Sequence, residues 1–252
     1  MKFVKNMKHM KRVRRVKRVK LICKLCKKVL TKGHINKHKC NKASQAHGKI
    51  FEDIVVKEVF KILDKIHYTS VHDIPAILNP FNTNENINIK TTGSKTICLS
   101  DILRFKNYDF TEEHTIIVIS YKQKGDYKHI TAIYEITYNQ ALHSLLFDSV
   151  THDEITSFNT YVKEIPHGEV SNEIKHIYKS QSKNLSKRGI LTYHAKVDSK
   201  KQRRTQCSIP KFANNLQPFI KYQSSPDAPN VLRGITIPPY IYSPLRARHA
   251  KL

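Results

Sequence analysis

The chain has 252 residues, enough for one large domain or for a medium domain with a small appendage. Its 45 Lys and Arg residues outnumber 20 Asp and Glu residues, and this net charge of +25 predicts an anionic partner, with nucleic acid as the first choice. No run of about 18 apolar residues is present and the N-terminal segment lacks the apolar core of a signal peptide, so we expect no membrane partner.

Residues 1–20 are rich in Lys and Arg and contain Val at positions 13, 16 and 19. This composition is typical of a basic arm that forms a helix on DNA or serves as a nuclear localisation signal, and a solvated tail is the alternative.

The five cysteines are an odd number, and three of them lie within residues 23–40. Such clustering favours an intracellular protein, in the cytoplasm or nucleus, that has a metal site rather than a disulfide framework.

The second segment, residues 21–42, contains four candidate zinc ligands, Cys23, Cys26, His38 and Cys40. Thiolate and imidazole ligands at this spacing hold a tetrahedral Zn²⁺, which supplies the folding free energy that so short a segment cannot obtain from a core. The segment resembles short two-Cys-His-Cys zinc fingers, but its last gap is tighter than theirs. His34, four positions before His38, is therefore an alternative fourth ligand to Cys40.

A helix is predicted from Gly48 onward, because apolar residues recur on one face at Phe51, Val55, Val59, Ile62 and Ile66. Glu52 lies beside that face, at the rim of the expected core. Residues 70–74 are expected to form a short strand that delivers Asp73 just before a proline.

Residues 86–90 alternate between polar and apolar side chains, which predicts a strand. Ile87 and Ile89 face one way, whereas Asn88 and Lys90 project together from the other face. A lysine beside a metal-bound phosphate can polarise water or stabilise developing charge, and carboxylates such as those of Glu52 and Asp73 are oxygen ligands for Mg²⁺.

The order Glu52, Asp73, Asn88-x-Lys90 resembles the core of PD-(D/E)XK nucleases, in particular type II restriction endonucleases, over about residues 48–137. By position, Asp73 matches the first Asp of the family and Lys90 its Lys. Asn88 stands where the family usually has Asp or Glu, and Glu52 or Glu85 would have to compensate for this weaker ligand.

The resemblance implies an α/β (α+β) fold with a mixed central sheet flanked by helices. It also implies Mg²⁺-dependent, sequence-specific cleavage of double-stranded DNA, in which Asp73 and Glu52 hold the metal, Lys90 assists the attacking water and Asn88 orients it. Family members that cut symmetric sites are commonly dimers, so a homodimer is allowed. Two alternatives stay open: a non-catalytic nucleic-acid-binding protein with a degenerate core, and a structural protein that uses its charge generically.

The region after the strand offers another arrangement. Asp101 is a good N-cap for a short helix that contains Arg104. Residues 115–138 read as two strands that flank a hairpin turn at Gly125. An alternative active site would pair Asp101 with Lys122 on the first of these strands.

The rest of the chain is predicted to hold helices over residues 139–187 and two strands around a basic turn over residues 189–212. Cys98 and Cys207 are expected to be isolated buried thiols. Candidate contacts to phosphates and to base edges are Lys95, Arg104, Arg203, Arg204 and Gln206. The predicted organisation is thus a basic arm (1–20), a zinc finger (21–42), a nuclease-like core domain (48–223) and an extended, basic, Pro-rich tail (224–252).

Overall fold

The computed structural model describes residues 21–22, 29–30, 43–63, 71–147, 149–198 and 202–243, and only the backbone of those before residue 48. The chain divides into two compact units, residues 1–44 and residues 45–252. In the first unit, β1 (Leu21–Ile22) and β2 (Val29–Leu30) form an antiparallel pair. The basic arm and the predicted zinc ligands lie outside the described residues, so both stay predictions; these ligands are Cys23, Cys26, His38 and Cys40, with His34 as the alternative.

The described part of the second unit is built on a mixed sheet of five strands. These strands are β3 (Glu85–Thr92), β5 (Glu113–Lys124), β6 (Tyr127–Thr137), β9 (Ile220–Gln223) and β12 (Tyr240–Tyr242). β3 runs parallel to β5, whereas β5 and β6 form an antiparallel hairpin. β9 and β12 both pair with the outer edge of β6, near its opposite ends. The predicted mixed sheet and the hairpin at Gly125, which has a φ of 54°, are confirmed.

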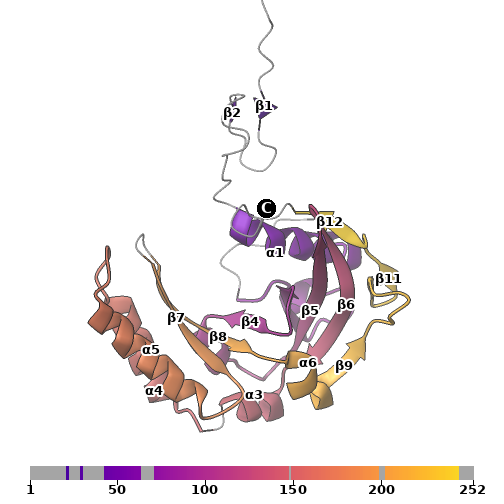
Figure 1. Ribbon diagram of the computed structural model, residues 1–252. Coiled ribbons are helices and arrows are strands. Elements are labelled where there is room, and N and C mark those ends of the chain that lie inside the picture. The colour runs from indigo at the N-terminus through magenta and orange to yellow at the C-terminus, as the bar shows by residue number, and fades with distance from the viewer. Residues whose placement is uncertain are drawn as a thin grey trace, which may run out of the picture. The chain divides into compact units, whose positions relative to one another are not determined.

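A second sheet of the same unit contains three antiparallel strands in the order β4-β8-β7, within the described residues. They are β4 (Ile97–Ser100), β7 (Thr192–Val197) and β8 (Arg203–Ile209). α4 (His152–Glu164) packs on β8 and α5 (Asn172–Ser186) packs on β7, so the two helices lie side by side along this sheet (Figure 1). The shorter helices are α2 (Ile102–Lys106), α3 (Gln140–Phe147) and α6 (Phe212–Asn215).

The central sheet separates two hydrophobic cores. Ile117 and Ile119 of β5 face a core that also contains Ile87 and Ile89. Ile116 and Val118, which alternate with them, face a second core shared with the second sheet and helices α2 to α5. Because β5 is buried on both faces, its sequence reads as a continuous apolar run instead of alternating.

α1 (Ala43–Ile54) and the π-helical turn η2 (Val55–Val59) cover the first core. Phe51, Val55 and Val59 are fully buried and Ile62 is partly buried, as the predicted apolar face requires, whereas Ile66 lies outside the described residues. The helix is shorter than predicted because Lys61 takes a left-handed φ of 56°, which a continuing helix cannot accommodate.

The part of residues 224–252 that the structure describes lies against the same core. β10 (Val231–Leu232) pairs with β11 (Ile235–Thr236), and Leu232, Ile237 and Ile241 are buried.

Cys207 is buried as predicted, but the prediction for Cys98 was wrong: alternate residues of β4 face outward, and Cys98 is one of them. Among the described helices, none has the length and apolar character needed to cross a bilayer.

Candidate active site

Asp73 lies at the outer edge of β3, at the point where backbone pairing with the preceding segment stops. Ile74 and Ile87 form an isolated antiparallel bridge with hydrogen bonds of 3.1 and 2.8 Å. One step further along the strand, the N–H of Ile89 donates to Asp73 Oδ2 at 2.6 Å. The carboxylate therefore takes the place of a backbone acceptor and is fixed against the strand edge, while 26% of its side chain stays exposed.

Lys90 forms an ion pair with this carboxylate. Its Nζ lies 3.8 Å from Asp73 Oδ2, and only 16% of its side chain is exposed. Asn88 and Lys90 are two positions apart on β3 and project from the same face, as the alternation predicted. The structure thus brings together Asp73, Asn88 and Lys90, which the sequence reasoning had grouped.

Asn88 is buried, and its amide is held by two partners. Its Nδ2 donates to the hydroxyl of Tyr108 at 2.8 Å and lies 3.2 Å from Nδ1 of His72. Burial, together with the electrostatic effects of His114 and Arg104, lowers the pKa of His72 to about 4, so the ring is neutral at pH 7 and its Nδ1 can accept. These contacts fix the amide nitrogen, whereas Oδ1 makes no hydrogen bond to a described residue.

Glu52 lies on α1 and is linked to Asp73 by its electrostatic effect alone. Its carboxylate pairs with Lys49 one turn earlier, and 25% of its side chain is exposed. Burial raises the pKa of Glu52; Lys49 opposes this shift and the negative charge of Asp73 adds to it. The two carboxylates are therefore within electrostatic reach of each other, and Lys49 does not fully compensate for the burial of Glu52.

The oxygen ligands considered for a metal are the carboxylates of Asp73 and Glu52 and the amide oxygen of Asn88. In the described part of the chain, no three His, Cys, Asp or Glu side chains converge as a preformed metal site. Mg²⁺, however, commonly binds through one or two carboxylates and keeps several waters, and it prefers oxygen ligands. The chemistry of Glu52, Asp73 and Asn88 therefore fits a magnesium ion, although Asn88 contributes a neutral oxygen where a third carboxylate would bind more strongly.

A cavity of about 540 Å³ opens beside this group, lined in part by His72, Arg104, Tyr108 and His114. The rings of His72, Tyr108 and His114 contact one another, with centroids 4.9 to 5.5 Å apart. The sequence reasoning missed this aromatic cluster, for which the only local signal was that His72 precedes Asp73. It did select Arg104, which is exposed at the cavity wall.

The other residues predicted to contact DNA have different environments. Lys95 and Arg204 are exposed. Arg203 donates to the carbonyls of Ile165 at 2.8 Å and Asp198 at 2.7 Å, and Gln206 is only 8% exposed. Arg203 thus ties the end of α4 to the β7–β8 turn, and neither it nor Gln206 presents the free donors that a groove contact requires.

The alternative pair, Asp101 and Lys122, is not brought together by any contact between described residues. Asp101 Oδ1 accepts from the backbone N–H of Arg104 at 3.2 Å, so this carboxylate caps α2 as predicted. Lys122 is exposed on β5. Asp101 therefore has a structural role that accounts for its presence.

Glu85, considered as a substitute for the missing acid, belongs to a separate buried ion network. Arg233 Nη2 lies 2.9 Å from both Glu85 and Glu135, and Lys221 Nζ lies 2.7 Å from Glu85. Burial opposes ionisation, but hydrogen bonds from Lys221 and Thr115 and the charge of Arg233 outweigh it and lower the pKa of Glu85 to about 2. Two carboxylates and two cations balance there, so Glu85 is already fully paired.

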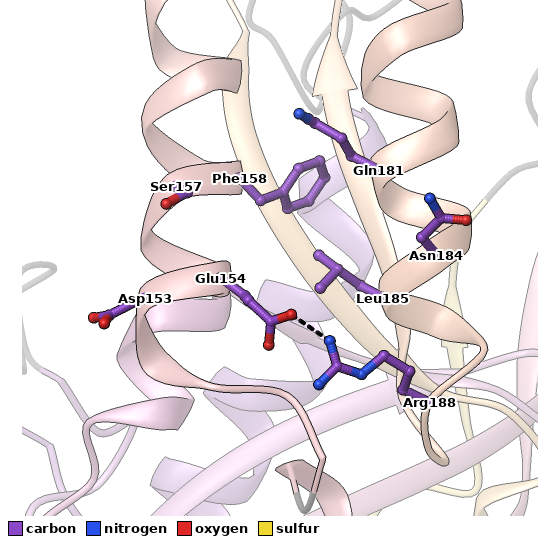
Figure 2. Close-up of a pocket in the computed structure, with 8 residues that line it drawn as sticks. All are labelled: Asp153, Glu154, Ser157, Phe158, Gln181, Asn184, Leu185 and Arg188. Atoms are coloured by element: carbon purple, nitrogen blue, oxygen red, sulfur yellow. Dashed lines mark hydrogen bonds and ion pairs between the residues drawn. The ribbon is translucent and has the colours of Figure 1, made fainter.

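A second hollow, of about 400 Å³, lies between α4 and α5. Figure 2 shows Phe158 and Leu185 facing each other across it, and the ion pair between Glu154 and Arg188 at one end. Asp153 points away from it. The hollow contains none of the residues predicted as site residues, and its ion pair is satisfied internally.

The arrangement around Asp73 offers carboxylate oxygens, an amide oxygen and an ammonium group at one strand edge, which is a set suited to hydrolysis of a phosphate ester. It is assembled from α1, the segment before β3, and β3 itself. Comparisons with family models, with curated proteins and with solved structures gave no match for this chain, so its interpretation depends on this geometry.

Proposed function

We propose that this protein is a Mg²⁺-dependent endonuclease that cleaves double-stranded DNA at specific sequences, in the manner of type II restriction endonucleases. The observation that carries the proposal is the pairing of Asp73 with Lys90 at the edge of β3, where Asp73 also accepts from the N–H of Ile89. A structural ion pair would need only Asp73 and Lys90. The negative charge of Asp73 also raises the pKa of Glu52 on α1, and a bound cation would relieve this repulsion between the two carboxylates.

Each residue of the group has a role that follows from its contacts. Bound Mg²⁺ would activate a water and neutralise charge on the phosphate. Asp73, held by the Ile89 N–H, and Glu52 would hold the ion, and Asn88 would offer Oδ1 to the ion or its water. Lys90 would stabilise the negative charge that develops on the phosphate oxygens.

The charge distribution supports DNA as the substrate. Residues 1–44 contain 17 of the 45 basic residues and no acidic residue, so this unit contributes most of the net charge. In the second unit, Lys95, Arg104 and Arg204 are exposed. A zinc finger within residues 21–42 and this surface would together bind the duplex, mainly through phosphates. A homodimer, implied by the same resemblance, is part of this proposal.

A second candidate function is a DNA-binding protein without catalysis. The observation that favours it is Asn88, whose neutral amide replaces an acid that the family uses as a metal ligand. This candidate predicts the same DNA affinity and no cleavage.

Replacing Lys90 by Ala separates the two candidates. We expect purified protein with Mg²⁺ to cut a long duplex into discrete fragments, and Lys90→Ala to lower the cleavage rate by about 10²- to 10³-fold, because a preorganised charge that stabilises the transition state is removed. Lys163→Ala removes an exposed lysine of α4 that has no part in the proposed site or DNA surface, and it should cut at the wild-type rate. DNA that is retarded in gels but uncut by every variant would eliminate the endonuclease in favour of the binding protein.

Replacing Glu52 by Gln should separate stability from metal binding. The pKa of Glu52 is raised in the folded state, so the ionised carboxylate destabilises the fold at pH values above its ordinary pKa. The neutral amide of Gln removes this charge. The urea concentration at the unfolding midpoint should therefore be unchanged or higher at pH 7. Saturating Mg²⁺ should raise the unfolding temperature of the wild type and of Glu58→Gln, an exposed acid on η2, but not of Glu52→Gln. An equal Mg²⁺ response in all three proteins would remove Glu52 from the proposed site.

A further inference from the structure

The outer ends of β5, β6 and β12 place six side chains in two cross-strand rows. The register pairs Lys122 with His129 and His129 with Tyr240, and it pairs Lys124 with Tyr127 and Tyr127 with Tyr242. Residues directly opposite each other on antiparallel strands project from the same face of the sheet. The rows therefore form one continuous surface, called here the tyrosine face: Lys122, Lys124, Tyr127, His129, Tyr240 and Tyr242.

The tyrosine face is exposed and aromatic. Tyr127, Tyr240 and Tyr242 are 43%, 50% and 54% exposed. The ring of Tyr127 contacts those of Tyr240 and Tyr242 edge-on at 5.5 and 5.6 Å, and His129 lies 5.3 Å from Tyr240. Three large rings gathered on one open sheet face are unusual for a surface that only meets water.

The requirements of folding do not account for these rings. The same strands bury Ile130 and Ile241 on their opposite face, in the core under α1. That face also holds Lys128, whose Nζ donates to the hydroxyl of Tyr121 at 2.8 Å. The inward-facing residues thus complete the core. Polar residues could replace the outward-facing tyrosines without any loss of core packing.

The charges on the tyrosine face are positive. Lys122 and Lys124 are exposed and form no ion pair with a described residue. Asp126, in the turn next to them, is the adjacent acid, and its backbone carbonyl accepts from the N–H of Ser243 at 2.7 Å. Flat aromatic rings next to unpaired lysines are complementary to nucleobases that are joined by phosphates.

We propose that the tyrosine face binds single-stranded nucleic acid, with unpaired bases stacked on Tyr127, Tyr240 and Tyr242 and the backbone held by Lys122 and Lys124. Paired bases in a duplex are already stacked on their neighbours, so only unpaired bases can use these rings. In the strand order β12-β6-β5-β3, β12 and β3 lie at opposite margins of the sheet, so the tyrosine face is separate from the Asp73 edge. The inference goes beyond the proposed endonuclease and does not depend on it.

The test uses the full chain and a single-stranded DNA of about 12 nucleotides that contains 2-aminopurine, whose fluorescence falls when it stacks. Salt of about 0.5 M suppresses the contribution of the basic N-terminal unit. We expect wild type and the triple variant Tyr127→Phe, Tyr240→Phe, Tyr242→Phe to quench the probe. The corresponding triple Ala variant should not quench it and should bind about 10- to 100-fold more weakly.

Two further variants keep the test decisive. The single substitution Tyr240→Ala, at an exposed position, guards against misfolding of the triple variant and should lower quenching in part. Asp73→Asn should quench like the wild type, which distinguishes failure of this inference from failure of the endonuclease proposal. Equal quenching by wild type and the triple Ala variant would overturn the inference. A second result would also overturn it. If the triple Ala variant binds the oligonucleotide as the wild type does but no longer sediments with phosphatidylserine vesicles, the tyrosine face binds membranes instead.

Discussion

Substitution of Asp73 by Asn is expected to reduce DNA cleavage by about 10³-fold or more while the protein stays folded. The amide oxygen of Asn can still accept from the N–H of Ile89, so the strand edge keeps its hydrogen bond. The negative charge that pairs with Lys90 and attracts the metal is lost. Single-turnover cleavage rates over a range of Mg²⁺ concentrations, with urea unfolding of the same samples, would measure the two effects separately.

The matched control for this experiment is Asp101→Asn. Asp101 caps α2, and Asn is as good an N-cap as Asp, so both folding and cleavage should be unchanged. This control also tests the alternative pairing of Asp101 with Lys122. Cleavage that survives Asp73→Asn but is lost in Asp101→Asn would show that the proposed site was assigned to the wrong carboxylate.

Removal of the Arg233 side chain by substitution with Ala is expected to destabilise the fold by about 3–5 kcal/mol, because it leaves Glu85 and Glu135 buried with incomplete compensation. The side chains of these carboxylates are 3% and 7% exposed, and Arg233 is 12% exposed. The guanidinium carbon also lies 5.1 Å from the ring centres of both Phe60 and Phe81. Urea unfolding at pH 7 would measure the loss, and Arg204→Ala, at an exposed position, should change stability little.

The same network gives a pH signature. The folded-state pKa of Glu85, about 2, is below its ordinary value, so the stability it contributes is present above about pH 4.5 and is lost as pH falls toward 2. In Arg233→Ala, the two carboxylates gain little by ionising, and protonation should relieve their repulsion. The stability difference between wild type and variant should therefore shrink below about pH 4.5. A difference that is constant from pH 7 to pH 3 would mean that Arg233 acts through packing alone.

Local sequence signals predicted several elements correctly. The alternation around Ile87 and Ile89 located β3 and the side that faces the core, the glycine at position 125 located the β5–β6 hairpin, and Asp101 located the start of α2. Each of these signals spans only a few residues, and the physical cause is local: strand periodicity, a left-handed turn residue and an N-cap.

What could not be predicted depends on contacts between distant parts of the chain. Alternation in β3 does not reveal that β3 pairs with β5 in parallel orientation. Between these two strands the chain forms β4, which belongs to the second sheet, and helix α2. Glu85 and Arg233 are 148 positions apart, and nothing next to either residue indicates the other. Residue type also misled: Arg203 and Gln206 suit base recognition chemically, but their environments tie up or bury them. The tyrosines at 127, 240 and 242 become one surface only through the pairing of β6 with β12.

The pairing of β6 also has a consequence for biosynthesis. β6 is complete at residue 137, but β9 and β12, which cover its outer edge, are not made until residues 220–242 have been added. At about 5–20 residues per second, a ribosome leaves that edge without partners for on the order of 5–20 s. Unpaired strand edges recruit other chains, so the nascent protein passes through a long interval in which chaperone capture or association between chains competes with completion of the fold.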